Sequence, residues 1–224
     1  IKEEKTNESE DTNTFKENEN NVTTSRIPDA STINDTKPDE DNLIKEEKSR
    51  IFSEALIKAQ NIKKDGNKYF TENNYALAEH HYKLGIDFTE EFVSENIIHK
   101  KYNSEIFDKI LVERIFLYSN LSNCHMKSSN YKDSLETDIY IVSQLDRMWD
   151  KSYNRIIQCA LRLDNIMMAK FYADTFRSMF NQETLSKYND TFKQLETRQK
   201  EEEEKMFKAQ KNMPQSTNKS SNVN

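Results

Sequence analysis

The sequence contains no proline between residues 39 and 213, a stretch that covers most of the chain. Its three prolines, Pro28, Pro38 and Pro214, all lie outside this stretch, and its only two glycines, Gly66 and Gly85, lie inside it. Tight turns between β-strands usually need glycine or proline, whereas long helices are broken by them. We therefore expect an all-α fold for this stretch.

The acidic character of the chain is concentrated at its N-terminus. Residues 1–49 carry 14 Asp or Glu against 7 Lys or Arg, and Phe15 is their only aromatic residue. Such a segment has too little apolar surface to offset the chain entropy lost on folding. We predict a disordered acidic arm over 1–49, a helical domain with an extended C-terminal helix over 50–211, and a disordered tail over 212–224.

The sequence contains few residues of the kinds that usually act in catalysis or bind metal ions. The only cysteines, Cys124 and Cys159, do not form a Cys-x-x-Cys pair and are expected to be buried free thiols. His80 and His81 are adjacent, so on a helix they point about 100° apart and cannot chelate one metal ion together. We found no nucleophile and base at a recognisable spacing and no phosphate-binding glycine loop. The sequence predicts no catalytic residue, no metal site, no cofactor and no enzymatic activity.

The segment that begins at Ala59, AQNIKKDGNKYFTENNYALAEHHYKLGIDF, reads as two helices joined by a short Asn-Asn turn. It resembles the tetratricopeptide repeat of about 34 residues, with Gly66 at position eight, Tyr75 at seventeen, Ala78 at twenty and Tyr82 at twenty-four. Small residues at positions eight and twenty let the two helices of a repeat approach closely, and aromatic side chains fill the space beside them.

The same register recurs from Ile115 and from Asp150. The last two repeats follow at the expected period, whereas residues 90–114 add about 22 residues between the first two. After the third repeat, residues 182–198 read as a helix that closes the stack, and residues 199–211 as its solvated continuation. The resemblance implies three tetratricopeptide helix-turn-helix repeats in a right-handed superhelix with a C-terminal closing helix.

Five polar residues fall on the first helices of these repeats. Lys63 and Asn67 share a helix face, as do Lys151 and Arg155, and Asn120 lies on the repeat between them. This set resembles the dicarboxylate clamp of tetratricopeptide co-chaperones, which include the large immunophilins, and all five positions match. The resemblance covers about residues 55–180. It also implies that Phe70 and Asn123 border a pocket for a peptide side chain.

The resemblance implies an adaptor protein that binds the C-terminal Glu-Glu-Val-Asp tail of heat-shock protein 90 or heat-shock protein 70. It implies a location in the cytoplasm, and a nuclear location is also compatible with it. Charge-assisted hydrogen bonds from the clamp would grip the two carboxylates of the terminal Asp. No nucleic-acid partner is expected. No membrane partner is expected either, because there is no apolar stretch long enough to span a bilayer. Replacing Lys151 or Arg155 by alanine is expected to change stability by no more than about 0.5 kcal/mol, as for surface residues in general.

Two alternatives stay open. The chain, which begins with Ile rather than Met, fits the helical part of a larger immunophilin with a peptidyl-prolyl isomerase domain upstream. It also fits a repeat scaffold that binds a partner other than a chaperone through another surface. The sequence leaves open the preferred chaperone, the client, the oligomeric state and the role of the acidic arm.

Overall fold

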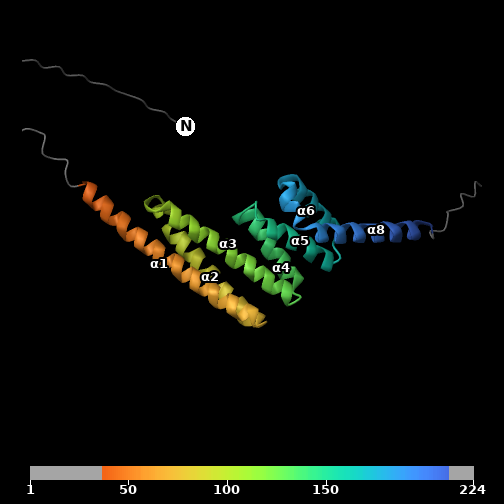
Figure 1. Cartoon of the computed structure of the whole chain (residues 1–224), viewed down its shortest axis with the longest axis horizontal. Coiled ribbons are helices and arrows are strands. Elements are labelled where there is room, and N and C mark those ends of the chain that lie inside the picture. Colours follow the sequence, from red (N-terminus) through yellow and green to blue (C-terminus); the bar gives the residue numbers. More distant parts are fainter. Residues whose placement is uncertain (1–36, 212–224) are drawn as a thin grey trace, which may run out of the picture.

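The computed structural model describes residues 37–211, and these residues form helices and contain no strand, which confirms the expected all-α class. In chain order, the elements are α1 (Lys37–Thr71), α2 (Tyr75–Asn96), the 3-10 helix η1 (Ile97–Tyr102), α3 (Ser104–Lys127), α4 (Tyr131–Tyr140), the π-helical turn η2 (Ile141–Leu145), α5 (Asp150–Arg162), α6 (Ile166–Met179), α7 (Gln182–Ser186) and α8 (Asn189–Lys211). From α1 to α6, each α-helix packs against the next one along the chain, and α1 also packs against α3. The helices follow one another along the long axis of the molecule, and α8 extends beyond the others at one end (Figure 1).

Three turns, between α1 and α2, α3 and α4, and α5 and α6, share one backbone geometry. In each, a residue with positive φ follows the first helix: Asn73 (58°), Ser129 (63°) and Asp164 (57°). The next residue is an asparagine whose N–H donates to the carbonyl five positions back, over 2.7–2.9 Å, while the positive-φ residue donates to the carbonyl three positions back. This pair of bonds is the Schellman motif, which satisfies carbonyls at the helix end. Each short polar turn therefore folds two consecutive helices back on each other.

The contact between α1 and α2 depends on Gly66. A Cβ atom at this position would lie 2.5 Å and 2.7 Å from two ring carbons of Tyr82. The Tyr82 ring cannot easily move away, because it is buried and its hydroxyl donates a hydrogen bond of 2.7 Å to Asn67 Oδ1. Ala78, the second small residue predicted at this contact, is also fully buried. The expected close approach of the two helices is confirmed.

Replacing Gly66 with alanine is expected to lower the free energy of unfolding by about 1–3 kcal/mol, because the added methyl overpacks the helix pair. The sign of the change in the free energy of unfolding distinguishes overpacking from the usual effect, because Gly→Ala in an exposed helix stabilises a protein by about 1 kcal/mol. Urea denaturation followed by circular dichroism measures the change. Adding Tyr82→Leu to the Gly66→Ala variant should recover part of the loss, and a stabilised single variant would contradict the overpacking.

The N-terminal boundary of the folded domain differs from the prediction. The acidic arm was predicted to reach residue 49, but α1 begins at Lys37, so residues 37–49 are helical; residues 1–36 and the predicted tail over 212–224 lie outside the described residues. The side chains of residues 40–47 are exposed, whereas the middle of α1 packs through the buried Phe52 and Ala55 against Phe107 and Ile110 of α3. The spacing of Phe52, Ala55 and Ala59 along one helix face was the sequence signal for this contact.

The extra residues between the first two predicted repeats lengthen helices rather than forming a loop. They continue α2 to Asn96, form η1 and begin α3 at Ser104. Phe92, in the added part of α2, lies with its ring centroid 5.9 Å from that of Phe52. The insertion and the middle of α1 thus build one additional layer of core.

The C-terminal end of the array is covered by α7 and α8 instead of one continuous helix. Residues 187 and 188 interrupt the predicted closing helix, and the Tyr188 hydroxyl donates 2.9 Å to Asp150 Oδ2 on α5. Phe192 and Leu195 of α8 are buried in the cluster around Phe176 of α6. From residue 199 onward nearly every α8 side chain is exposed. None of the helices in residues 37–211 has both the length and the apolar composition needed to cross a membrane.

Candidate polar groove on α1, α3 and α5

The five residues of the predicted clamp lie on alternate helices of the array. Lys63 and Asn67 are on α1, Asn120 is on α3, and Lys151 and Arg155 are on α5. Because α3 packs against both α1 and α5, the five side chains come from helices in contact. They form two groups, one at the α1–α3 contact and one on α5.

The first group is joined by direct hydrogen bonds. Asn120 Nδ2 donates 3.0 Å to Asn67 Oδ1, the same atom that accepts the Tyr82 hydroxyl. Because the Asn67 oxygen already accepts two hydrogen bonds, its Nδ2 is the group left to act as a donor. Asn67 is exposed and Asn120 half-buried. The two amides thus form a small, oriented polar surface.

Lys63 is less free than the sequence suggested. Its Nζ forms an ion pair with Glu113 Oε2 on α3, and the two side chains are 21% and 10% exposed. Glu113 Oε1 also accepts a hydrogen bond of 3.4 Å from Gln60. The Lys63 ammonium lies 4.8 Å from the centre of the Phe116 ring, within the range of a cation–π contact. Glu113 therefore fixes Lys63 in position and neutralises part of its charge.

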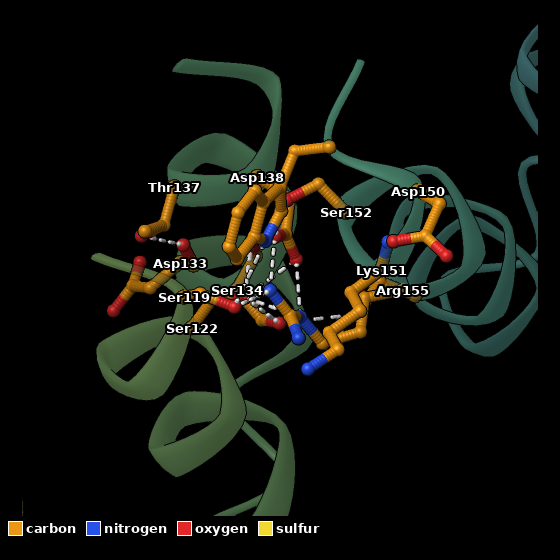
Figure 2. A network of polar contacts seen from close by, with 12 residues as sticks. Ser119, Ser122, Asp133, Ser134, Thr137, Asp138, Asp150, Lys151, Ser152 and Arg155 are labelled. Atoms are coloured by element: carbon orange, nitrogen blue, oxygen red, sulfur yellow. Dashed lines mark hydrogen bonds and ion pairs between the residues drawn. The ribbon is translucent and has the colours of Figure 1, made fainter. Parts of the chain in front are cut away.

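Arg155 is the centre of a second, buried polar network, which joins α5 to α3 and α4. Its Nε and Nη2 donate to the two oxygens of Asp138 on α4, at 2.9 Å and 2.6 Å. Ser122 and Ser152 also donate to this carboxylate, at 2.5 Å and 2.6 Å. Ser119 accepts a bond of 2.9 Å from Arg155 Nη2. Figure 2 shows the guanidinium between α3 and α4, with dashed contacts to both helices.

Because of this network, we expect Arg155 to contribute to stability, in contrast to the expectation from the sequence that it contributes little. The Asp138 side chain is 0% exposed and that of Arg155 only 11%. A buried charge is tolerated when it is paired and its remaining sites are hydrogen-bonded, and removing one partner leaves the other uncompensated. Arg155 consequently has a structural role. Its Nη1, with no hydrogen-bond partner among residues 37–211, is the donor left for a ligand.

Lys151 differs from Arg155 although the two are one turn apart. Its side chain is exposed and forms no ion pair within the described residues. Its backbone N–H donates a hydrogen bond of 2.8 Å to Asp150 Oδ1. In Figure 2 the Lys151 chain extends alongside Arg155. Lys151 is therefore the more available cation of the α5 pair.

A cleft of about 470 Å³ opens beside these two residues, between α3, α5 and Tyr188. It includes Asn123, one of the two residues predicted to border a peptide pocket, but Phe70 is not part of its lining. The Phe70 ring instead packs edge-on against Tyr75, with centroids 5.5 Å apart. The structure thus separates the two predicted pocket residues.

The cleft also contains polar residues that sequence reasoning missed. These residues are Lys127, Asn154, Gln158 and Arg162. Gln158 and Arg162 continue the line of Lys151 and Arg155 at helical spacing, so all four share one face of α5. This polar stripe, opposite the buried Ile156 and Ala160, was the signal that could have revealed them.

The two cysteines do not contribute to the groove. Both are buried free thiols, as predicted. Burial, reinforced by the charge of Glu79, raises the pKa of Cys124 to about 12. Burial also raises the pKa of Cys159. Because the thiolate is the reactive form, both thiols act as packing groups at neutral pH. No three His, Cys, Asp or Glu side chains of residues 37–211 come together as a metal-ligand set.

Comparisons of the sequence with models of known protein families and with curated proteins gave no match.

Proposed function

We propose that this chain is an adaptor of three tetratricopeptide repeats that binds the acidic C-terminal tail of heat-shock protein 90 or heat-shock protein 70. The recurrence of one turn geometry after α1, α3 and α5 supports the repeat assignment. So does the contact of Gly66 with Tyr82, since both residues match the repeat pattern at a close-packing position. In this proposal the helices form a right-handed superhelix, and α7 and α8 close its end.

One observation carries the proposal: cations and amides of α3 and α5, with Lys151 and Arg155 of the predicted clamp among them, border a cleft that no carboxylate of residues 37–211 lines. The other three clamp residues, Lys63, Asn67 and Asn120, lie outside the lining of this cleft. No acidic residue lines the 470 Å³ cleft within the described part of the chain, although the whole chain has a net charge of −6. Lys127, Lys151, Arg155 and Arg162 all reach it. A surface that concentrates positive charge in an acidic protein favours an anionic ligand.

The donors suit a chain end better than an internal acidic residue. A C-terminal Asp has two carboxylates a few ångströms apart. In this proposal, one carboxylate is bound by Asn67, Asn120 and Lys63. The other carboxylate is bound by Lys151 and by Nη1 of Arg155. Each charge-assisted hydrogen bond contributes about 1.5–3 kcal/mol before desolvation and entropy losses. Because the ion pair with Asp138 already orients Arg155, little rotamer entropy remains to be lost there on binding.

The test is a calorimetric titration with the peptide Met-Glu-Glu-Val-Asp as the free acid and as the C-terminal amide. The free acid is expected to bind with a Kd of roughly 1 µM, about −8 kcal/mol, and more weakly as salt is added. The amide should bind at least tenfold more weakly, because it lacks one of the two carboxylates. Equal binding of the two peptides, or no effect of salt, would refute the carboxylate clamp.

Replacing Glu113 with glutamine is expected to tighten binding of the free-acid peptide by about threefold or more. The substitution keeps a hydrogen-bond acceptor for Lys63 but removes the negative charge that competes with the ligand. Calorimetry with the same peptide measures the effect. The matched control is Glu136→Gln on the exposed surface of α4, which should leave the Kd unchanged. Unchanged or weaker binding by Glu113→Gln would show that Lys63 does not contact the peptide.

A further inference from the structure

A second cleft, of about 590 Å³, continues the first one between α5 and α8. The two clefts share Met126, Gln158 and Arg162, so they form one groove that runs from Lys151 to the closing helix. The side chains that α8 adds to this groove are Lys193, Gln194, Thr197 and Arg198. The face of α8 that turns toward α5 is therefore basic and polar beyond its buried Leu195.

The second cleft also has no acidic lining residue among residues 37–211. Of its three cations, Arg198 is paired with Asp164 and Glu201. Arg162 and Lys193 are exposed and have no ion pair within the described residues. The Arg162 guanidinium lies 5.9 Å from the centre of the Tyr131 ring, which helps to hold it over the groove. Two available cations thus meet across the groove from α5 and α8.

The dimensions fit an extended peptide. Lys151 and Arg162 are eleven residues apart on α5, which corresponds to about 16 Å at 1.5 Å per residue. An extended chain covers this distance with about five residues at roughly 3.3 Å each. A peptide whose terminal Asp lies at Lys151 would therefore bring the side chains about five or six positions before its end to Arg162 and Lys193.

We propose that the groove between α5 and α8 is a second binding site, in which Arg162 and Lys193 bind acidic side chains five to six positions before the end of the peptide ligand. This inference rests on the proposed function and extends it: the closing helix selects ligands by their upstream charge. No aromatic residue of residues 37–211 lines the cleft between α5 and α8, so this part of the groove lacks the stacking surface that single-stranded nucleic acids use; Tyr131 and Tyr188 line only the first cleft. The chemistry therefore favours an acidic peptide.

The experiment compares three free-acid peptides by calorimetry on the whole chain. One is Met-Glu-Glu-Val-Asp; the other two are ten residues long, end in the same five residues, and carry either Glu or Gln at the sixth and seventh positions from the end. The Glu peptide is expected to bind about tenfold more tightly than the Gln peptide, because it adds two charge pairs. The variant Arg162→Gln/Lys193→Gln should abolish this difference. Lys193→Gln alone, which changes a residue that lines the second cleft and not the first, should reduce the difference but change the Kd of the five-residue peptide by less than about twofold.

The matched control is Lys64→Gln/Lys132→Gln, which removes two exposed cations outside both clefts and should keep the tenfold difference. Equal binding of the two long peptides by the unmodified chain, or a difference that survives in Arg162→Gln/Lys193→Gln, would overturn the inference and leave the proposed function intact. Failure of the five-residue peptide to bind would overturn the proposed function, and this inference with it. An oligouridine that binds as tightly as the Glu peptide, and is lost in the same variant, would assign the groove to nucleic acid instead.

Discussion

Replacing Arg155 with alanine is expected to lower the free energy of unfolding by about 3–5 kcal/mol, because it leaves the Asp138 carboxylate buried without a cation. The carboxylate has no exposed surface and is paired with Arg155 through two hydrogen bonds. The hydroxyls of Ser122 and Ser152 would remain, but neutral donors only partly replace a positive charge. Urea denaturation followed by circular dichroism gives the change directly.

Three further variants, Arg50→Ala, Asp138→Ala and Asp138→Ala/Arg155→Ala, separate this effect from a general loss of charge. Arg50→Ala removes an arginine whose ion pair with Glu54 is exposed, and should change stability by no more than about 0.5 kcal/mol. The double variant Asp138→Ala/Arg155→Ala removes both charges, so its loss should be at least about 1.5 kcal/mol smaller than the sum of the single losses. If Arg155→Ala behaves like Arg50→Ala, the ion pair with Asp138 does not stabilise the fold.

Replacing Lys151 with alanine should weaken binding of the free-acid peptide by about 2 kcal/mol, or thirtyfold, while leaving stability within about 0.5 kcal/mol. Lys151 is exposed and borders the cleft, so its charge is available to a ligand and contributes little to packing. Calorimetry measures the Kd, and urea denaturation of the same sample measures the stability.

Lys64→Ala serves as the control, because it removes an exposed cation that lines neither cleft and should leave the Kd unchanged. Lys151→Arg should keep most of the affinity, since the charge remains on a side chain of similar reach. A loss of less than about threefold in Lys151→Ala would contradict direct contact between Lys151 and a ligand carboxylate. Because Arg155 also supports the fold, Lys151 is the cleaner probe of binding.

The contrast between Lys151 and Arg155 shows what the local sequence pattern could predict and what it could not. Their four-residue spacing correctly predicted that Lys151 and Arg155 share a helix face. This spacing did not indicate that Arg155 would pair with the buried carboxylate of Asp138 or that Lys151 would not. Asp138 occupies the position of the second predicted repeat that Tyr82 occupies in the first, so a search for hydrophobic periodicity passed over it. A polar residue at a core position was the available signal, because such a residue needs a partner.

The sequence by itself determined the local features of the structure, namely its helices, its turns and the contact within the first helical hairpin. The absence of proline over residues 39–213 set the helical class, polar residues such as Asn73 and Asn74 set the turns, and Gly66 set the close contact of α1 with α2. Each of these depends on backbone preferences or on neighbours within a hairpin. The same holds for the face shared by Lys151 and Arg155, which follows from helical periodicity alone.

What only the tertiary structure decided is which distant side chains meet. Lys63 pairs with Glu113, 50 residues away, and Arg155 with Asp138, 17 residues away on another helix. The second half of the groove exists because α8 packs beside α5. Such contacts depend on the angle and register at which whole helices pack. These are set by the summed shape of many side chains and so cannot be assigned to any short stretch of sequence.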